Sequence, residues 1–182
     1  VPRYRQLGSH HLQVEDLRHV GHVALAITET IQSKVRIAVA ARLTLRDADG
    51  VIAGDRLTVH QEIDDAWIGH EAHVTVVEGA SVIADKIAVL TTSRDAATSS
   101  PEESALTLLS MTSSVEELSR SHDLAWLRLW QRFHIDVEAG GPVEVATLRL
   151  YAYHLIISMY GVSAGNLDAG VPARGLHGEA YR

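Results

Sequence analysis

The spacing of apolar residues changes once along this 182-residue chain, and that change sets the fold class. Between Gly21 and Thr92, apolar residues recur at every second position, as in strands with one covered face. After Pro101 they recur every three or four positions, which is the spacing of amphipathic helices. We therefore predict an α+β chain in which an antiparallel β part precedes a helical part.

The alternation is clearest in residues 34–45. One face carries the apolar residues Val35, Ile37, Val39, Ala41, Leu43 and Leu45. The opposite face carries Lys34, Arg36, Arg42 and Thr44. This pattern predicts a half-buried antiparallel strand with the apolar set on its covered face.

Turn residues divide the rest of the β part into short runs. The turn signals are Gln32-Ser33-Lys34, Asp49-Gly50, Gly54-Asp55 and Glu78-Gly79-Ala80, and the runs between them include Val23–Ile31, Ala72–Val77 and Val82–Thr92. Short runs at such spacing are typical of hairpins. We expect a sandwich-like antiparallel sheet.

Helix starts are marked by capping residues. Ser100-Pro101-Glu102-Glu103 combines an N-cap hydroxyl, a proline in the first turn and a carboxylate three residues after the cap. Ser114-Val115-Glu116-Glu117 repeats the hydroxyl and the carboxylate of this capping box. Pro142 opens a third helix with the apolar stripe Val145, Leu148, Ala152, Leu155 and Met159. We predict helices over 101–111, 115–132 and 142–160, and a short extended piece at Ile135–Glu138.

Composition excludes several classes of protein. Sixteen basic and 23 acidic residues give a net charge of −7, and aromatic residues are few, so we expect no nucleic-acid partner. The longest apolar runs, Val23–Ile27 and Ile37–Ala41, are too short for a membrane span, so we expect no membrane partner. The absence of cysteine excludes disulfides and thiolate metal sites and fits the cytoplasm.

Three patterns of reactive side chains are weak evidence for a catalytic or metal site. Gly161-Val162-Ser163-Ala164-Gly165 has the spacing of an esterase nucleophile, but it follows a helix, and Asp168 and His177 are too near in sequence for the usual acid and base. On a strand His70 and His73 point to opposite faces, which leaves Glu71 and His73 as at most two metal ligands. The acidic pairs at 102–103 and 116–117 are explained as helix starts, and Asp64-Asp65 as a turn. We predict no metal site.

Two further histidines lie in the helical pattern. His122 and His154 occupy positions where a packed histidine with a local hydrogen bond is the usual finding. We expect both to pack within their helices.

The segment 166–182 is the most informative for function. It combines three glycines with Arg174, His177, Glu179 and Tyr181 directly after the third predicted helix. Glycines permit close backbone approach, and the polar groups suit sugar hydroxyls or a phosphate. From these residues alone, an ordinary interhelical loop and a ligand site are equally compatible with the pattern.

Val171 to Tyr181 strongly resembles a run found in glycoside hydrolase family 65, the maltose, trehalose and kojibiose phosphorylases. The family run has the form (Val/Ile)-(Pro/Gly)-Ala-Arg-Gly-Leu-x-Gly-Glu-(Gly/Ala)-Tyr. The family's junction between sandwich and helical linker is similar to Thr92-Ser93-Arg94-Asp95 followed by residues 101–105. The family's sandwich is similar to residues 1–5 together with His11-Leu12. The resemblance covers the whole chain in the right order, although Gly161–Asn166 departs from the sequence usual in the family at that place.

The resemblance implies a three-part organisation. It comprises an N-terminal β-sandwich part at 1–96, a helical linker at 97–140 and the start of an (α/α)₆ catalytic barrel at 141–182. It also implies that the chain is a fragment, since the family run continues into Gly-His-x-Phe-Trp-Asp and only later reaches the general-acid glutamate. We expect a parent enzyme and an isolated chain that is inactive.

The implied activity is inverting transfer of a glucosyl unit from an α-linked glucose disaccharide to phosphate or water. The resemblance carries over only a rim of the substrate site, with no roles assigned and no catalytic residue: Arg174, Gly175, Gly178, Glu179 and Tyr181. No cofactor is expected, and inorganic phosphate would be a co-substrate of the parent. A homodimer is one option for the parent. The alternative is a non-catalytic carbohydrate-binding β-sandwich module.

Overall fold

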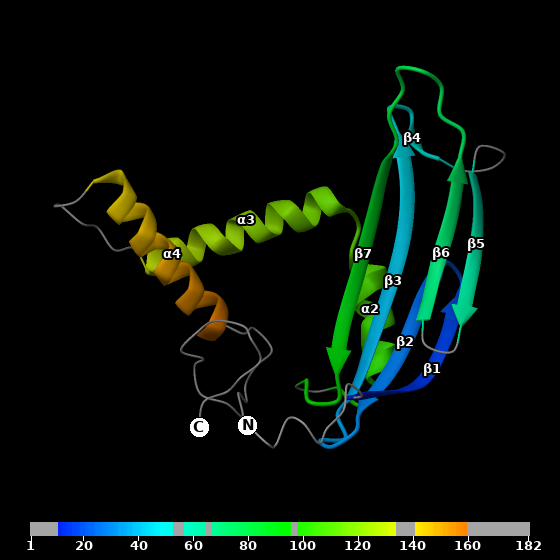
Figure 1. Cartoon of the computed structure of the whole chain (residues 1–182), viewed down its shortest axis with the longest axis horizontal. Coiled ribbons are helices and arrows are strands. Elements are labelled where there is room, and N and C mark those ends of the chain that lie inside the picture. The colour runs from blue at the N-terminus through cyan, green and yellow to red at the C-terminus, as the bar shows by residue number, and fades with distance from the viewer. Residues whose placement is uncertain (1–10, 53–56, 65–66, 96–97, 134–140, 160–182) are drawn as a thin grey trace. The chain divides into compact units, whose positions relative to one another are not determined.

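The computed structural model describes residues 11–52, 57–64, 67–95, 98–133 and 141–159 (Figure 1). The chain divides into two compact units, Val1–Glu117 and Leu118–Arg182. The first unit contains the described strands and helix α2, Pro101–Met111, and most of the remaining described helical residues lie in the second. Each unit is described by itself below.

Two antiparallel sheets make up the β part of the first unit. The larger sheet has the order β1-β2-β3-β4, and β7 pairs with β3. A separate hairpin is formed by β5 and β6. The bounds are β1 Leu12–Val20, β2 Val23–Thr30, β3 Arg36–Asp47, β4 Gly50–Val51, β5 Leu57–Asp64, β6 Trp67–Val74 and β7 Ile83–Thr92. The predicted antiparallel β part followed by helices is confirmed, and the chain is α+β.

In the described residues three helices follow the strands: α2 Pro101–Met111, α3 Val115–Arg132 and α4 Pro142–Met159. The predicted bounds of the first two are confirmed residue for residue, and the third ends one residue earlier than predicted. Both capping hydroxyls accept a hydrogen bond, from the Glu103 amide to Ser100 Oγ at 3.2 Å and from the Glu117 amide to Ser114 Oγ at 3.1 Å. Ile135–Glu138 lies outside the described residues.

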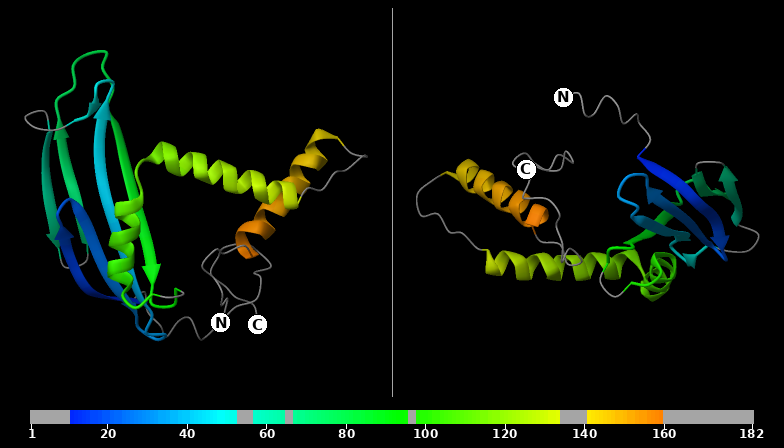
Figure 2. Two further views of the ribbon diagram at one scale, coloured as in Figure 1. Left: turned by 180° about the vertical axis from the view of Figure 1, so that it is seen from behind. Right: turned by 90° about the horizontal axis from the view of Figure 1, so that it is seen from below.

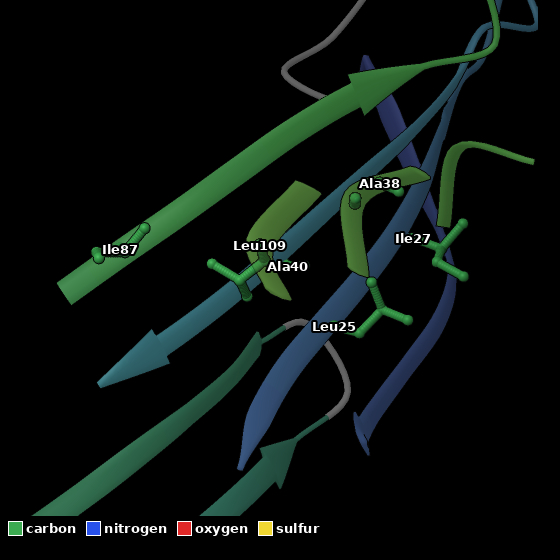
Figure 3. Close-up of a cluster of buried hydrophobic side chains, with 7 residues drawn as sticks. Leu25, Ile27, Ala38, Ala40, Ile87 and Leu109 are labelled. Atoms are coloured by element: carbon green, nitrogen blue, oxygen red, sulfur yellow. The ribbon is translucent and has the colours of Figure 1, made fainter. Parts of the chain in front are cut away.

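The core of the first unit lies between one face of the larger sheet and α2. Its buried side chains come from β2, β3, β7 and α2, and six of them are labelled in Figure 3: Leu25, Ile27, Ala38, Ala40, Ile87 and Leu109. Ala105 of α2 completes the cluster. Ala38 and Ala40 are both fully buried, and their small side chains let the helix approach the sheet closely.

The core face of β3 differs from the predicted one. Leu45 of the predicted apolar set is buried, but Ile37 and Val39 are only half-buried. The opposite face carries the fully buried Ala38 and Ala40. Arg42 lies on this second face as well, since it pairs across the ladder with Val23, which packs against the core. The prediction was wrong because α2, which no strand pattern reveals, covers the alanine face.

The β5–β6 hairpin contacts the larger sheet at β1, at β2 and at the turn between them. Gln61 Nε2 donates a hydrogen bond of 2.6 Å to the Gly21 carbonyl, and His19 Nε2 lies 3.2 Å from the Gly69 carbonyl. His19 pairs with Ala24, the neighbour of Leu25, so it lies on the face away from the core. The hairpin therefore contacts that face while α2 covers the other (Figure 2).

Candidate functional site

The predicted rim of the substrate site lies beyond the last described residue. Arg174, Gly175, Gly178, Glu179 and Tyr181 all fall in 160–182, outside the described residues. Ser163, Asp168 and His177 of the esterase pattern fall there too. The last described element before Ser163 is helix α4, not the strand that a nucleophile elbow requires. The candidate features in the described part are therefore three side-chain clusters.

The first cluster is a row of arginines on the core face of β3, Arg36, Arg42 and Arg46, called here the β3 arginine row. Arg42 donates hydrogen bonds to backbone carbonyls at the end of α2: from Nη1 to Leu109 at 3.1 Å, and from Nη2 to Ser113 at 3.2 Å and to Thr112. The last carbonyls of a helix lack helical partners and carry partial negative charge. Arg42 therefore caps α2 from the sheet.

The other two members of the row hold the starts of the helices. Arg36 Nη2 lies 3.6 Å from Glu102 at the start of α2, and Arg46 pairs with Glu116 at the start of α3. Each arginine also binds a carboxylate of a strand, Arg36 that of Glu15 at 2.8 Å and Arg46 that of Asp85 at 2.5 Å. These hydrogen bonds are the largest cause of the raised pKa of both arginines.

The acidic residues at the helix starts are therefore structural. Glu102 and Glu116 were predicted as helix-start residues, and each faces an arginine of β3 in addition to its helix terminus. These contacts account for both carboxylates without a catalytic role. The sequence did not reveal these pairs, because the face of the strand that carries Arg36 was assigned to solvent.

The second cluster contains the histidines of β6. His73 Nε2 lies 2.8 Å from Glu71 Oε1, while the His70 ring contacts the His19 ring edge to face at 5.0 Å between centroids. The prediction that His70 and His73 point to opposite faces is confirmed. Among the described residues, no group of three or more histidine, aspartate or glutamate side chains has an arrangement that could hold a metal ion.

The third cluster joins α3 and α4 within the second unit. Trp126 of α3 stacks on Tyr153 of α4, with ring centroids 5.1 Å apart and planes 29° from parallel. Trp130 lies one turn further along α3, with its ring 6.0 Å from that of Trp126. Leu129 and Ile156, one from each helix, are buried. Trp126 and Tyr153 had not been identified as a site, although Trp126 and Trp130 are four residues apart and so share a helix face.

The histidines of α3 and α4 lie at the margin of this cluster. The His122 ring is 6.2 Å from Trp126, and the His154 ring is 5.6 Å from Tyr153. Both side chains are exposed. The prediction that they are packed within their helices was wrong, because each lies beside the aromatic contact and not beneath it.

The apolar stripe of α4 is incompletely covered. Val145, Leu148 and Ala152 are half-buried and Leu155 is 55% exposed, while Met159 is not described at side-chain level. Val143, Leu150 and Tyr151 add further exposed apolar surface, at 74%, 51% and 61%. In the described part of the chain, no helix is both long enough and apolar enough to span a membrane.

Comparison with known proteins decides the family. Residues 1–129 match the N-terminal domain of glycosyl hydrolase family 65. This match covers more than half of the chain and includes the seven described strands, α2 and most of α3. The chain belongs to glycosyl hydrolase family 65. The family assigned from the resemblance of Val171–Tyr181 is confirmed, and the match lies in a different part of the chain from that run.

Longer proteins align with this family 65 chain over its entire length. Two strains of Mycobacterium tuberculosis, CDC 1551 / Oshkosh and H37Rv, each have an uncharacterized glycosyl hydrolase that is 44% identical over 183 residues. The trehalose 6-phosphate phosphorylase of Lactococcus lactis subsp. lactis strain IL1403 is 25% identical over 182 residues. The chain spans 13% of the length of the mycobacterial proteins and 22% of the phosphorylase.

Proposed function

We propose that the parent of this chain is an inverting enzyme that transfers a glucosyl unit from an α-linked glucose disaccharide to phosphate or water. The observation that carries the proposal is the family 65 match over residues 1–129. It is supported by the order of elements, an antiparallel β part followed by capped helices. The run Val171–Tyr181, which resembles a run of the family at the rim of the substrate site, supports the proposal from a separate part of the sequence.

Within that enzyme the chain would supply three parts. Residues 1–96 would form a β-sandwich part, 97–140 a helical linker, and 141–182 the start of an (α/α)₆ barrel that begins with α4. Arg174, Gly175, Gly178, Glu179 and Tyr181 would line the rim of the sugar site. There the glycines would allow close backbone approach, and Arg174 and Glu179 would offer directional hydrogen bonds to hydroxyls.

The chemistry needs groups that the proposal assigns to other parts of the parent. Inversion requires an acid that protonates the leaving glycosidic oxygen and a nucleophile on the opposite face of the sugar ring. With phosphate as nucleophile, an α-linked disaccharide yields β-glucose 1-phosphate and a free sugar. The proposal assigns no acid role to Glu102 or Glu116, since each is paired with an arginine of β3 at the start of a helix.

The proposed substrates of the parent are phosphate and a disaccharide. Its proposed location is the cytoplasm, where phosphate is abundant and a chain without cysteine needs no disulfides. Among the relatives, the Lactococcus lactis protein is a trehalose 6-phosphate phosphorylase by name. Its identity to this chain is only 25%, so the donor sugar must be identified by experiment. The panel of sugars to be tested contains trehalose 6-phosphate, maltose, trehalose, kojibiose and nigerose.

The test is an activity assay on the 182-residue chain and on a longer protein whose reading frame continues past Arg182. We expect the continuation to read Gly-His-x-Phe-Trp-Asp. Each sugar is supplied with and without phosphate, and β-glucose 1-phosphate and glucose are measured. Turnover by the longer protein alone supports the proposal, and its dependence on phosphate decides between phosphate and water as the acceptor. Turnover by the 182-residue chain at the same rate, or a continuation without the Trp-Asp pair, would contradict it.

The same panel addresses the rival function, a non-catalytic carbohydrate-binding module. Such a module would bind an oligosaccharide with the 182-residue chain alone and would leave all the sugars unchanged in the longer protein. Calorimetric titration of the chain with each sugar measures that binding directly. Binding without turnover in either protein would favour the module over the enzyme.

A further inference from the structure

The β5–β6 hairpin is attached to the larger sheet through side chains. In the described ranges neither of its strands pairs with a strand of that sheet. The contacts across the junction include the hydrogen bond from Gln61 to the Gly21 carbonyl and the approach of His19 to the Gly69 carbonyl. A junction without shared strand hydrogen bonds opens at a lower free energy than the sheet itself unfolds.

Three histidines meet at this junction. His19 lies on β1, His22 on the turn between β1 and β2, and His70 on β6. The rings of His19 and His70 are in edge-to-face contact at 5.0 Å, with planes 76° apart. His70 also forms a hydrogen bond with the backbone of His22. Its Nε2 atom is buried and has no hydrogen-bond partner among the described residues.

The charged groups that act on His70 are all cations when they carry charge. They are His19 from β1, His22 from the turn and Lys86 from β7. The strand paired with β6 places the neutral Gln61 opposite His70. Glu71 and His73 form a pair on the other face of β6, where both are more than half exposed. Burial is the largest cause that lowers the pKa of His70, and the neighbouring cations add to it.

We propose that His19, His22 and His70 form a histidine latch that holds the β5–β6 hairpin on the larger sheet when neutral and releases it when protonated. In the closed state the neutral rings contact each other edge to face. A proton on His70 introduces a charge beside His19, His22 and Lys86, in a site where the Nε2 atom has no hydrogen-bond partner among the described residues. Separation of the hairpin from β1 relieves this cost, since the His70 ring is then hydrated.

Histidine is the side chain whose ordinary titration range lies just below neutral pH, so the latch responds to mild acidification. Its opening uncovers the face of the larger sheet that lies away from the core, where His19 and Ala24 pair. The core between α2 and the other face stays closed, because none of its side chains titrates. Acidification therefore changes one surface of the first unit without unfolding it.

The test is hydrogen exchange of the 182-residue chain between about pH 7.5 and pH 5, corrected for the intrinsic pH dependence of amide exchange. Protection of 67–74 should fall by up to about tenfold for each pH unit below about pH 6.5, because each opening takes up a proton. Protection of 36–47 should not change. His70→Gln keeps a hydrogen-bonding group but no titrating one, and should abolish the effect. His73→Gln, on the exposed face of the same strand, is the matched control and should retain it.

Three outcomes would overturn the latch. They are undiminished protection of 67–74 in the wild-type chain at pH 5, the same pH dependence in His70→Gln as in the wild type, and a ring titration of His70 by NMR at or above its ordinary pKa. If His70→Gln leaves the hairpin unprotected at every pH, the His19→Gln variant is the deciding test. Loss of the His19 ring should then reduce the pH dependence of protection in 67–74, and an unchanged dependence counts against the latch.

Discussion

Arg42 Nη1 donates a hydrogen bond of 3.1 Å to the carbonyl oxygen of Leu109, the buried leucine near the end of α2. The same guanidinium contacts the carbonyls of Thr112 and Ser113. A side chain from the middle of the sheet thus satisfies carbonyls that the end of the helix leaves without partners. Since α3 begins three residues after Thr112, Arg42 fixes the point at which the chain turns from α2 into α3.

Replacement of Arg42 should destabilise the first unit. Arg42→Met keeps most of the aliphatic stem but removes the donors, so up to three carbonyls lose a charged partner. We expect a loss of about 1–3 kcal/mol in the free energy of unfolding, measured by urea denaturation. Arg18→Met is the matched control, because Arg18 pairs with Asp16 on an exposed part of β1. Equal losses in the two variants would show that Arg42 does not act as a cap.

The alanines beneath α2 should not tolerate larger side chains. Ala40 is fully buried in the core, so Ala40→Leu must push α2 from the sheet or force strained rotamers. We expect a destabilisation of about 1–3 kcal/mol. Ala88→Leu adds the same atoms on an exposed position of β7, and should change stability by less than about 0.5 kcal/mol. A stable Ala40→Leu variant would show that α2 does not pack closely on β3.

The β3 strand also shows how far the sequence determined the fold. Alternation of Val35 to Leu45 established a strand, and Ser100 and Ser114 established the helix starts, because both are local patterns. Which face of β3 is covered depends on α2, more than 50 residues later, and no local pattern contains that information. The contact of Trp126 with Tyr153 was missed for the same reason, since it joins two helices.

The family assignment depended on a different kind of signal. Arg174, Glu179 and Tyr181 were singled out because a run of residue types matched a family, not because their geometry was known. The match of residues 1–129 supports the family from another part of the chain. Site geometry arises from the folded packing of several segments, so a run of seventeen residues at 166–182 indicates chemistry without giving distances.

The stability of the first unit should decrease as the pH falls below neutral. Burial lowers the pKa of His70 in the folded chain, so the unfolded chain binds a proton at higher pH than the folded chain does. The contribution of His70 is therefore present above its unfolded pKa, near 6.5, and is lost as the pH falls from there towards the folded value. Urea denaturation at about pH 7.5 and pH 5.5 measures it. The decrease should be smaller in His70→Gln and unchanged in His73→Gln.

The aromatic contact should hold α4 on α3. Tyr153→Ala removes the ring that stacks on Trp126, so α4 should lose protection from hydrogen exchange in 142–157. A double-mutant cycle with Trp126→Ala should give a coupling of about 0.5–1.5 kcal/mol, the usual value of an aromatic pair. Tyr151→Ala is the matched control, since Tyr151 is 61% exposed and lies two residues away. A coupling near zero would show that the rings do not stabilise the helix pair.

In the 182-residue chain, α4 should be the least protected of the three helices. Val143, Leu150 and Leu155 are each at least half exposed, and every Å² of apolar surface left in water forgoes roughly 25 cal/mol. By contrast α2 is anchored by Ala105 and Leu109, both buried. Hydrogen exchange should therefore be faster in 142–159 than in 101–111, and exposed apolar area favours self-association at high concentration. Slow exchange throughout 142–159 in a monodisperse monomer would show that contacts with α3 suffice to hold this helix.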